Sequence, residues 1–213
     1  AEDKRPYNNK TVRDTEMANN MDRITGDYND FWAGRDYIND MKPMKAALLM
    51  SHGFNDWNVM PEHSNRISQE AKKMGIPTQI FYHQNGHGGP PPMKMMNRWF
   101  TRYLHGVENG VENDAKAWIV REDDARTDPT AYADYPNPAA KSVQLYLEGN
   151  APSIGQLTTS KPKSKKTETL TDDSTKSGTA LAKSTSSDNR LLFVTPTLKE
   201  DVHLSGLSTL TIK

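Results

Sequence analysis

The fold is decided by residues 46–89, which read AALLMSHGFNDWNVMPEHSNRISQEAKKMGIPTQIFYHQNGHGG. The apolar run 46–50 ends in a Ser-His-Gly turn, and this pattern predicts a buried parallel strand. Pro61 can open a helix and Gly75 can end it. A second apolar run at 79–82 predicts another strand. Strand, helix and strand in short succession indicate an α/β unit, in which helices cover a parallel sheet.

The α/β pattern of predicted strands and helices continues to about Gly106 and then changes. A loop rich in glycine and proline at 85–92 leads into a second predicted helix. The apolar residues of that helix share one face; they are Met96, Trp99, Phe100, Tyr103 and Leu104. One more strand is predicted at 116–120, and an irregular, proline-bearing stretch follows at 123–138. The segment 43–137 is therefore predicted to hold the α/β part of the chain.

A different pattern, typical of an antiparallel all-β region, fills the C-terminal part. Apolar and polar residues alternate over 143–147, 191–194 and 207–212. Between these runs, 153–189 is dominated by Ser, Thr, Lys and Asp. This polar stretch is either a disordered linker or a long excursion of a β-sandwich. The sandwich interpretation is favoured, because strand patterns resume directly afterwards.

Residues 1–42 are polar, with scattered Met and aromatic side chains, and the stretch 11–21 is predicted to be helical. We expect this segment to be a cap or insertion on the α/β part. The hydrophobic share of 34% and the mean hydropathy of -0.84 are low for a compact domain. Either much of the chain is loop, or polypeptide outside these residues packs against its apolar surface and completes the hydrophobic core.

Composition excludes several classes of function. Lys plus Arg and Asp plus Glu each number 27, so the formal charge is +0, which argues against a strongly basic nucleic-acid binder. The absence of Cys rules out disulfides and thiolate chemistry. No apolar run is long enough for a membrane span, and no Gly-rich phosphate loop with a following Lys occurs. We therefore expect no nucleic-acid partner, no membrane and no cofactor; a cytoplasmic location is the default, with secretion left open.

Two loops could carry chemistry, because each directly follows a predicted parallel strand and sites in open α/β sheets form at the carboxyl ends of strands. The first loop, 52–59, holds Asp56, and the second, 83–90, holds His87. A serine hydrolase needs an imidazole to take the proton of its nucleophile, and a carboxylate to hold that imidazole in one tautomer. The acid precedes the histidine, with one helix and one strand between them. Adjacent strands would therefore bring Asp56 and His87 together.

Simpler interpretations of these residues stay open. An Asp after Asn in a turn is commonly an Asx-turn or helix-capping residue, and a His among glycines is commonly a flexible loop residue. His52 and His83 lie near strand ends and are predicted to be structural. A metal site formed by His52, His83 and His87 is disfavoured, because their spacing matches no metal-ligand motif and Cys is absent.

Three segments are more specific than the rest. They are FWAGRDY at 31–37, the residues 45–59 with a His-Gly-x-x-Asp-x-x-Val loop, and RWFTRYLHGV at 98–107. Together these motifs resemble the X-prolyl dipeptidyl aminopeptidases, which form a wider group with cocaine-esterase-like (CocE/NonD) and acylase-type hydrolases. The resemblance implies that Asp56 is the catalytic acid and His87 the catalytic base.

The resemblance also implies a fold, since residues 191–206 are similar to the opening of the family's C-terminal jelly-roll domain. The expected fold class is α/β: a partial α/β-hydrolase fold, with the last strands and helices of a parallel sheet, followed by the start of an all-β jelly-roll domain. In this division, 1–42 is the cap or insertion and 43–137 is the C-terminal part of the catalytic domain. The N-terminal part of the jelly roll is 138–213.

One feature of the family is missing. Its nucleophile is a Ser in a Gly-x-Ser-x-Gly elbow that precedes the acid, and no such elbow occurs here. We therefore expect the remaining N-terminal part of the same enzyme to supply the Ser, and this chain alone to be inactive. The implied chemistry is two-step acyl transfer to water on a small peptide or ester substrate. A homo-oligomer is left open.

Three functions are consistent with these patterns. The first is an X-prolyl dipeptidyl peptidase, favoured by residues 31–37 and 53–59. The second is an esterase or amidase of the same fold that acts on small esters or acylated amines. The third is a non-catalytic β-sandwich module that binds carbohydrate or a protein partner.

Overall fold

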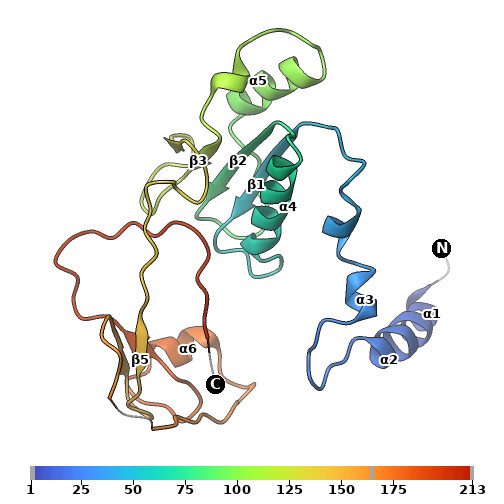
Figure 1. Ribbon diagram of the computed structural model, residues 1–213. Coiled ribbons are helices and arrows are strands. Elements are labelled where there is room, and N and C mark those ends of the chain that lie inside the picture. Colours follow the sequence, from blue (N-terminus) through green and yellow to red (C-terminus); the bar gives the residue numbers. More distant parts are fainter. Residues whose placement is uncertain (1–2, 164–165, 212–213) are drawn as a thin grey trace. The chain divides into compact units, whose positions relative to one another are not determined.

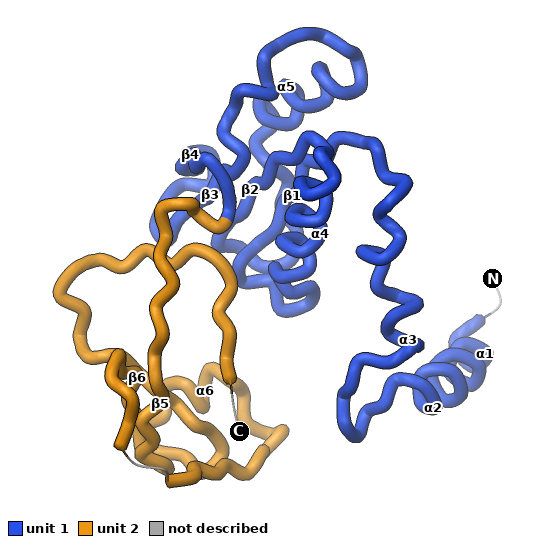
Figure 2. Tube along the Cα trace, in the orientation of Figure 1, with its two compact units in different colours: residues 1–135 blue, residues 136–213 orange. Residues whose placement is uncertain are grey.

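The computed structural model describes residues 3–163 and 166–211. The chain divides into two compact units, 1–135 and 136–213, which Figure 2 distinguishes by colour. Each unit has a sheet of its own.

A four-stranded sheet lies at the centre of the first unit (Figure 1). Across the sheet its strands are, in order, β1 (Leu48–Gly53), β2 (Thr78–His83), β3 (Ala117–Ile119) and β4 (Thr130–Tyr132). β1, β2 and β3 are parallel, and β4 runs antiparallel to β3. The three strands predicted for the α/β part are therefore confirmed.

Two details differ from the predictions. β1 continues beyond the predicted run 46–50, because residues 51–53 keep pairing with β2. β4 lies inside the stretch 123–138, which the sequence predicts to be irregular. Its three residues are too few to show an alternating pattern, and they form a strand by pairing with β3.

Helix α4 (Pro61–Lys73) connects β1 to β2 and packs against both, as Figure 1 shows. Pro61 stands in the first turn, where its missing N–H costs no helical hydrogen bond. Gly75, with a φ of 73°, follows the end of the helix in a left-handed conformation that suits glycine. The buried side chains of α4 are small, which allows close packing; they are Ser64, Asn65, Ser68 and Ala71.

Helix α5 (Met93–Tyr103) follows the loop after β2, and the 3-10 turn η3 (Val111–Asn113) comes next. Trp99 is buried, whereas Phe100 and Leu104 of the predicted apolar face are exposed. Arg98 Nε donates to Asp114 Oδ2 at 2.6 Å, which fastens α5 to the segment leading into β3.

The core of the first unit is centred on β2, whose six residues are all buried. It consists of Ile80, Tyr82, Ala117, Ile119 and Tyr135, with Met50, Phe54 and Tyr132 packed against them. The ring of Tyr82 meets those of Tyr135 and Phe54 edge-on, at centroid distances of 5.1 and 5.5 Å. Full burial of a large apolar side chain stabilises the fold by about 1.5–3 kcal/mol. These contacts therefore hold the carboxyl end of the sheet in place.

The N-terminal segment is partly helical, as predicted for 11–21. Its elements are α1 (Arg5–Asn8), η1 (Asn9–Met17, a π-helix), α2 (Ala18–Asn20), α3 (Asp30–Ala33) and η2 (Tyr37–Asp40). None of the residues in these elements is buried. Arg66 of α4 donates to Asp36 at 3.1 Å, which links the segment to the rest of its unit. Within the described ranges, no helix has the length and apolar character needed to cross a membrane.

The second unit contains a three-stranded sheet in the order β5 (Tyr146–Glu148), β6 (Gly155–Thr158) and β7 (Phe193–Val194). β5 and β6 are antiparallel, but β6 and β7 are parallel, so the prediction of a purely antiparallel region is wrong. Neighbouring parallel strands need a long crossover. The residues between β6 and β7, which include helix α6 (Gly178–Lys183), provide it.

The stretch 153–189 contains β6 and α6, so it is not a linker without regular structure, and the favoured β-sandwich interpretation stays a prediction. One further prediction fails in this unit. The alternating pattern at 207–212 gives no strand over 207–211, where no described strand pairs with it; Ile212 lies outside the described residues. The jelly-roll domain stays a prediction.

Candidate active site

The loops that follow β1 and β2 meet at one edge of the sheet. The parallel register pairs Gly53 with His83, so both strands end at the same level. Phe54 N donates to His83 O at 2.7 Å, and Asn55 N donates to Asn85 O at 3.3 Å. The sequence-based expectation that the two loops come together is confirmed by these bonds.

Gly53 permits this close approach. A Cβ atom at position 53 would lie 2.1 Å from Asn85 O and 2.5 Å from Gly86 O, both backbone atoms. No larger residue fits unless one of the loops moves. Glycine at the end of β1 therefore sets the distance between the two loops.

Asp56 lies in the first loop, and its side chain is only 4% exposed. Its Oδ1 accepts hydrogen bonds from the amides of Asn58 at 2.9 Å and Val59 at 3.0 Å. Its Oδ2 lies 3.0 Å from Nδ1 of His87. The sequence left open whether Asp56 forms an Asx-turn or contacts the imidazole. In the structure it does both, because Oδ1 accepts the turn amides and Oδ2 contacts His87.

The environment of Asp56 favours its charged form. Burial acts to raise its pKa, but the amides of Val59 and Asn58 and the imidazole of His87 together lower the pKa to about 2. The carboxylate is therefore ionised at any pH near neutrality. An ionised carboxylate accepts the Nδ1–H of His87, which leaves Nε2 of that ring as the acceptor.

Apart from the contact of its Nδ1 with Asp56, the imidazole of His87 is largely open to solvent, with 63% of the side chain exposed. In the described part of the chain, its Nε2 forms no hydrogen bond. An exposed Nε2 behind an Nδ1 held by a buried carboxylate is suited to accept a proton from a hydroxyl group.

The loop of His87 is held by two side chains from other segments. Ser51 Oγ donates to Gly89 O, and Arg126 Nη2 donates to Pro90 O, each at 2.6 Å. Gly89 has a φ of 122°, and a Cβ there would lie 2.5 Å from Arg126 Nη2. Sequence reasoning missed Arg126, since a single Arg in a polar, irregular stretch carries no distinguishing signal.

The two other histidines predicted to be structural differ in their surroundings. His83 is buried, accepts from Asn85 N at 3.2 Å, and has a pKa lowered by burial and by the Arg126 guanidinium. His52 instead contacts Asp56 itself, with its Nε2 3.3 Å from Asp56 Oδ2. In residues 3–163 and 166–211, no three His, Cys, Asp or Glu side chains gather in a way that could hold a metal ion.

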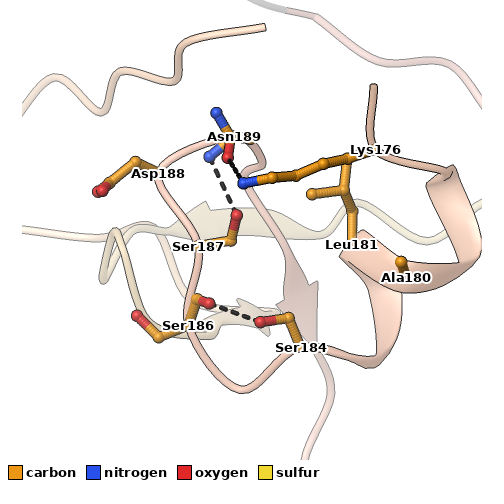
Figure 3. Close-up of a pocket in the computed structure, with 8 residues that line it drawn as sticks. All are labelled: Lys176, Ala180, Leu181, Ser184, Ser186, Ser187, Asp188 and Asn189. Atoms are coloured by element: carbon orange, nitrogen blue, oxygen red, sulfur yellow. Dashed lines mark hydrogen bonds between the residues drawn. The ribbon is translucent and has the colours of Figure 1, made fainter. Parts of the chain in front are cut away.

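The second unit contains a separate hollow of about 350 Å³ (Figure 3). Its lining is mostly polar and consists of Lys176, Ala180, Leu181, Ser184, Ser186, Ser187, Asp188 and Asn189. Several of these groups bond one another: Lys176 with Asn189, Ser184 Oγ with Ser186 O, and Asn189 N with Ser187 Oγ. The residues that line the hollow include no carboxylate bonded to an imidazole, in contrast to Asp56 and His87 in the strand-end loops.

Comparison with known proteins agrees with the sequence motifs. The family model of the X-Pro dipeptidyl-peptidase (S15 family) matches residues 2–89, the part that contains Asp56 and His87. The model of the X-Pro dipeptidyl-peptidase C-terminal non-catalytic domain matches residues 109–213.

Individual relatives carry the same description. A putative Xaa-Pro dipeptidyl-peptidase of Rhodopirellula baltica is 54% identical over 205 residues, which cover 96% of this chain and 33% of the relative. One of Bacillus anthracis is 31% identical over 202 residues, covering 92% of this chain and 33% of that protein. An Xaa-Pro dipeptidyl-peptidase of Lacticaseibacillus rhamnosus is 33% identical over 134 residues, which cover 60% of this chain and 17% of that protein.

The chain thus spans about a third of the length of the first two relatives. Two successive family models cover most of it, and both describe parts of the same kind of peptidase. The chain belongs to the X-Pro dipeptidyl-peptidase (S15) family.

Proposed function

We propose that Asp56 and His87 are the acid and base of a serine peptidase that releases X-Pro dipeptides. The observation that carries this proposal is the 3.0 Å contact between His87 Nδ1 and Asp56 Oδ2, with the rest of the imidazole exposed. Family membership supports the peptide substrate. The nucleophilic Ser would come from polypeptide outside these 213 residues, because the chain holds no Gly-x-Ser-x-Gly elbow.

The proposed reaction has two acyl-transfer steps. Nε2 of His87 accepts the proton of the Ser hydroxyl as the hydroxyl oxygen attacks the carbonyl carbon of the substrate Pro, the carbon of the bond that is cleaved. The imidazolium so formed is stabilised by Asp56, and it passes the proton to the leaving amine. Water then attacks the acyl-enzyme, giving its proton to the same Nε2, and the Ser hydroxyl is restored when the dipeptide leaves.

The unpaired edge of β1 supports a proposal for where the nucleophilic Ser lies. β1 pairs with β2 on one side, and no described strand pairs with its other side. Five of its six residues are only partly buried, whereas those of β2 are all buried. We infer that further parallel strands extend the sheet beyond β1. A Ser at the carboxyl end of such a strand would lie on the same side of the sheet as His87.

The test is kinetic and uses the enzyme expressed from its full-length gene. We expect hydrolysis of an Ala-Pro anilide, and we expect Asp56→Asn or His87→Ala to lower kcat by about 10³–10⁴-fold while each variant stays folded at the assay temperature. His63→Ala, which changes an exposed histidine of α4, is the matched control and should leave kcat unchanged. Normal turnover in either site variant would refute the assignment.

The same assay separates the esterase or amidase alternative. An esterase of this architecture would hydrolyse a short acyl ester in preference to the Ala-Pro anilide. In that case the unsubstituted enzyme would not hydrolyse the anilide, and substitution of Asp56 or His87 would abolish ester hydrolysis. This result would keep the two residues as acid and base and would make an ester, rather than an X-Pro peptide, the substrate.

A further inference from the structure

The carboxylate of Asp56 faces two imidazoles rather than one. Its Oδ2 lies 3.0 Å from Nδ1 of His87 and 3.3 Å from Nε2 of His52. The two rings differ in exposure, since the side chain of His52 is 9% exposed and that of His87 is 63% exposed. Asp56 therefore contacts one imidazole that is mostly covered and one that is exposed, and only the exposed one can meet a substrate.

The partners of His52 determine its tautomer. Nε2 lies 2.8 Å from Val59 O, and a carbonyl oxygen can only accept a hydrogen bond, so Nε2 carries the proton. Nδ1 is bonded to the hydroxyl of Ser64, which can donate to it. A neutral ring thus satisfies both contacts. Its single N–H points toward Val59 O and lies within reach of Asp56 Oδ2.

These bonds connect the loop of Asp56 to two regular elements. Val59 donates its N–H to Asp56 Oδ1 and accepts from His52 through its carbonyl oxygen. His52 belongs to β1, and Ser64 is a buried residue in the first turn of α4. The turn that shapes Asp56 is therefore held between the end of the strand and the start of the helix.

We propose that His52 is a positioning residue that holds the carboxylate of Asp56 in line with Nδ1 of His87. It does not touch the reacting atoms; it acts through Asp56, because its Nε2 donates to Val59 O in the turn of Asp56 and lies 3.3 Å from Oδ2. Its importance for turnover rests on the proposed function, whereas its effect on the Asp56–His87 hydrogen bond does not.

Two amide substitutions separate this role from ordinary packing. In His52→Gln the side-chain amide can reach the place of Nε2 and keep a donor toward Val59 and Asp56, while the contact with Ser64 is lost. In His52→Asn the shorter amide reaches only the place of Nδ1, so Ser64 keeps its acceptor and the donor is lost. We expect His52→Asn to lower kcat of the full-length enzyme by about 10-fold with KM nearly unchanged, and His52→Gln to stay near the parent value.

A spectroscopic readout tests the positioning without turnover. In the full-length enzyme labelled with ¹⁵N-histidine, the Nδ1 proton of His87 should give a hydrogen-bonded resonance in the parent and in His52→Gln. We expect that resonance to shift or vanish in His52→Asn. If His52→Asn does not fold, Ser64→Ala takes its place, because it removes the hydrogen bond that holds Nδ1, lets the ring move away from Val59 and Asp56, and should shift the same resonance. His63→Gln, an exposed position on α4, is the matched control.

The two proposals fail in different measurements. Equal kcat and equal His87 resonances in the Asn and Gln variants would overturn the role of His52, and so would an unchanged resonance in Ser64→Ala. Full turnover of Asp56→Asn would overturn the proposed function and would leave the resonance test of His52 intact.

Discussion

At the scale of single residues, Asp56 shows how one carboxylate serves structure and chemistry at once. One oxygen accepts two amides of its own turn, and the other meets His87. A carboxylate that accepts several N–H groups is favoured in its charged form even where burial opposes it. The turn therefore keeps Asp56 ionised, and an ionised Asp56 orients the imidazole.

The lowered pKa of Asp56 predicts a specific pH dependence of stability. Its pKa is about 2 in the folded chain against an ordinary value of 3.8, so ionisation stabilises the folded state above pH 3.8. That contribution is lost as the pH falls from 3.8 toward about 2. We expect the free energy of unfolding of the parent to exceed that of Asp56→Asn at pH 5, and the difference to shrink by pH 2, as measured by urea unfolding. Other carboxylates cancel in the comparison, and a difference that is constant down to pH 2 would contradict the assignment.

At the scale of elements, β1 and β2 create the site by ending at the same level. Their parallel register brings Gly53 opposite His83, and the loops beyond them bond through Phe54 and Asn55. Tyr82 packs against Phe54 and Tyr135, so the core continues to the base of both loops. Neither loop alone would hold Asp56 against His87.

The close approach of the loops can be tested at Gly53. A methyl group there meets the backbone oxygens of Asn85 and Gly86 at 2.1 and 2.5 Å, so Gly53→Ala must push the loops apart. We expect it to reduce the free energy of unfolding by about 2 kcal/mol. The matched control is Gly86→Ala in the facing loop, where a Cβ meets its nearest atom at an ordinary 3.5 Å. Equal stabilities of the two variants in thermal unfolding would contradict this account.

At the scale of the whole molecule, the two units differ in how much apolar surface they bury. The first has a buried central strand and a core that reaches its strand-end loops. The second has three short strands and many exposed apolar side chains, among them Val143, Leu204 and Leu210. A sheet of three short strands buries little apolar surface, and the buried apolar side chains of the described residues accordingly lie between Ala71 and Tyr135, in the first unit.

The chain as a whole should not react with a probe for active serines. His87 has no hydroxyl partner at Nε2 in the described residues, and no elbow Ser occurs in the sequence. We expect a fluorophosphonate probe to label the product of the full-length gene and to leave the 213-residue chain unlabelled, as judged by mass spectrometry. Labelling of a Ser within these 213 residues would show that the proposed division of the site is wrong.

The sequence by itself determined the elements whose causes are local. The apolar runs at 46–50 and 79–82, and Pro61 before an amphipathic segment, identified the parallel strands and α4, and the motif around Asp56 identified the family. Only the tertiary structure decided the rest. β4 exists because β3 lies beside it, the pairing of β7 depends on the path of a long crossover, and the residues at 207–211 find no described partner. Likewise the contact of Arg126 with Pro90 joins segments far apart in the chain, and such a contact leaves no periodic or spacing signal that sequence alone could reveal. The contact of His52 with Asp56 is local in sequence, but it depends on how the turn between them folds back.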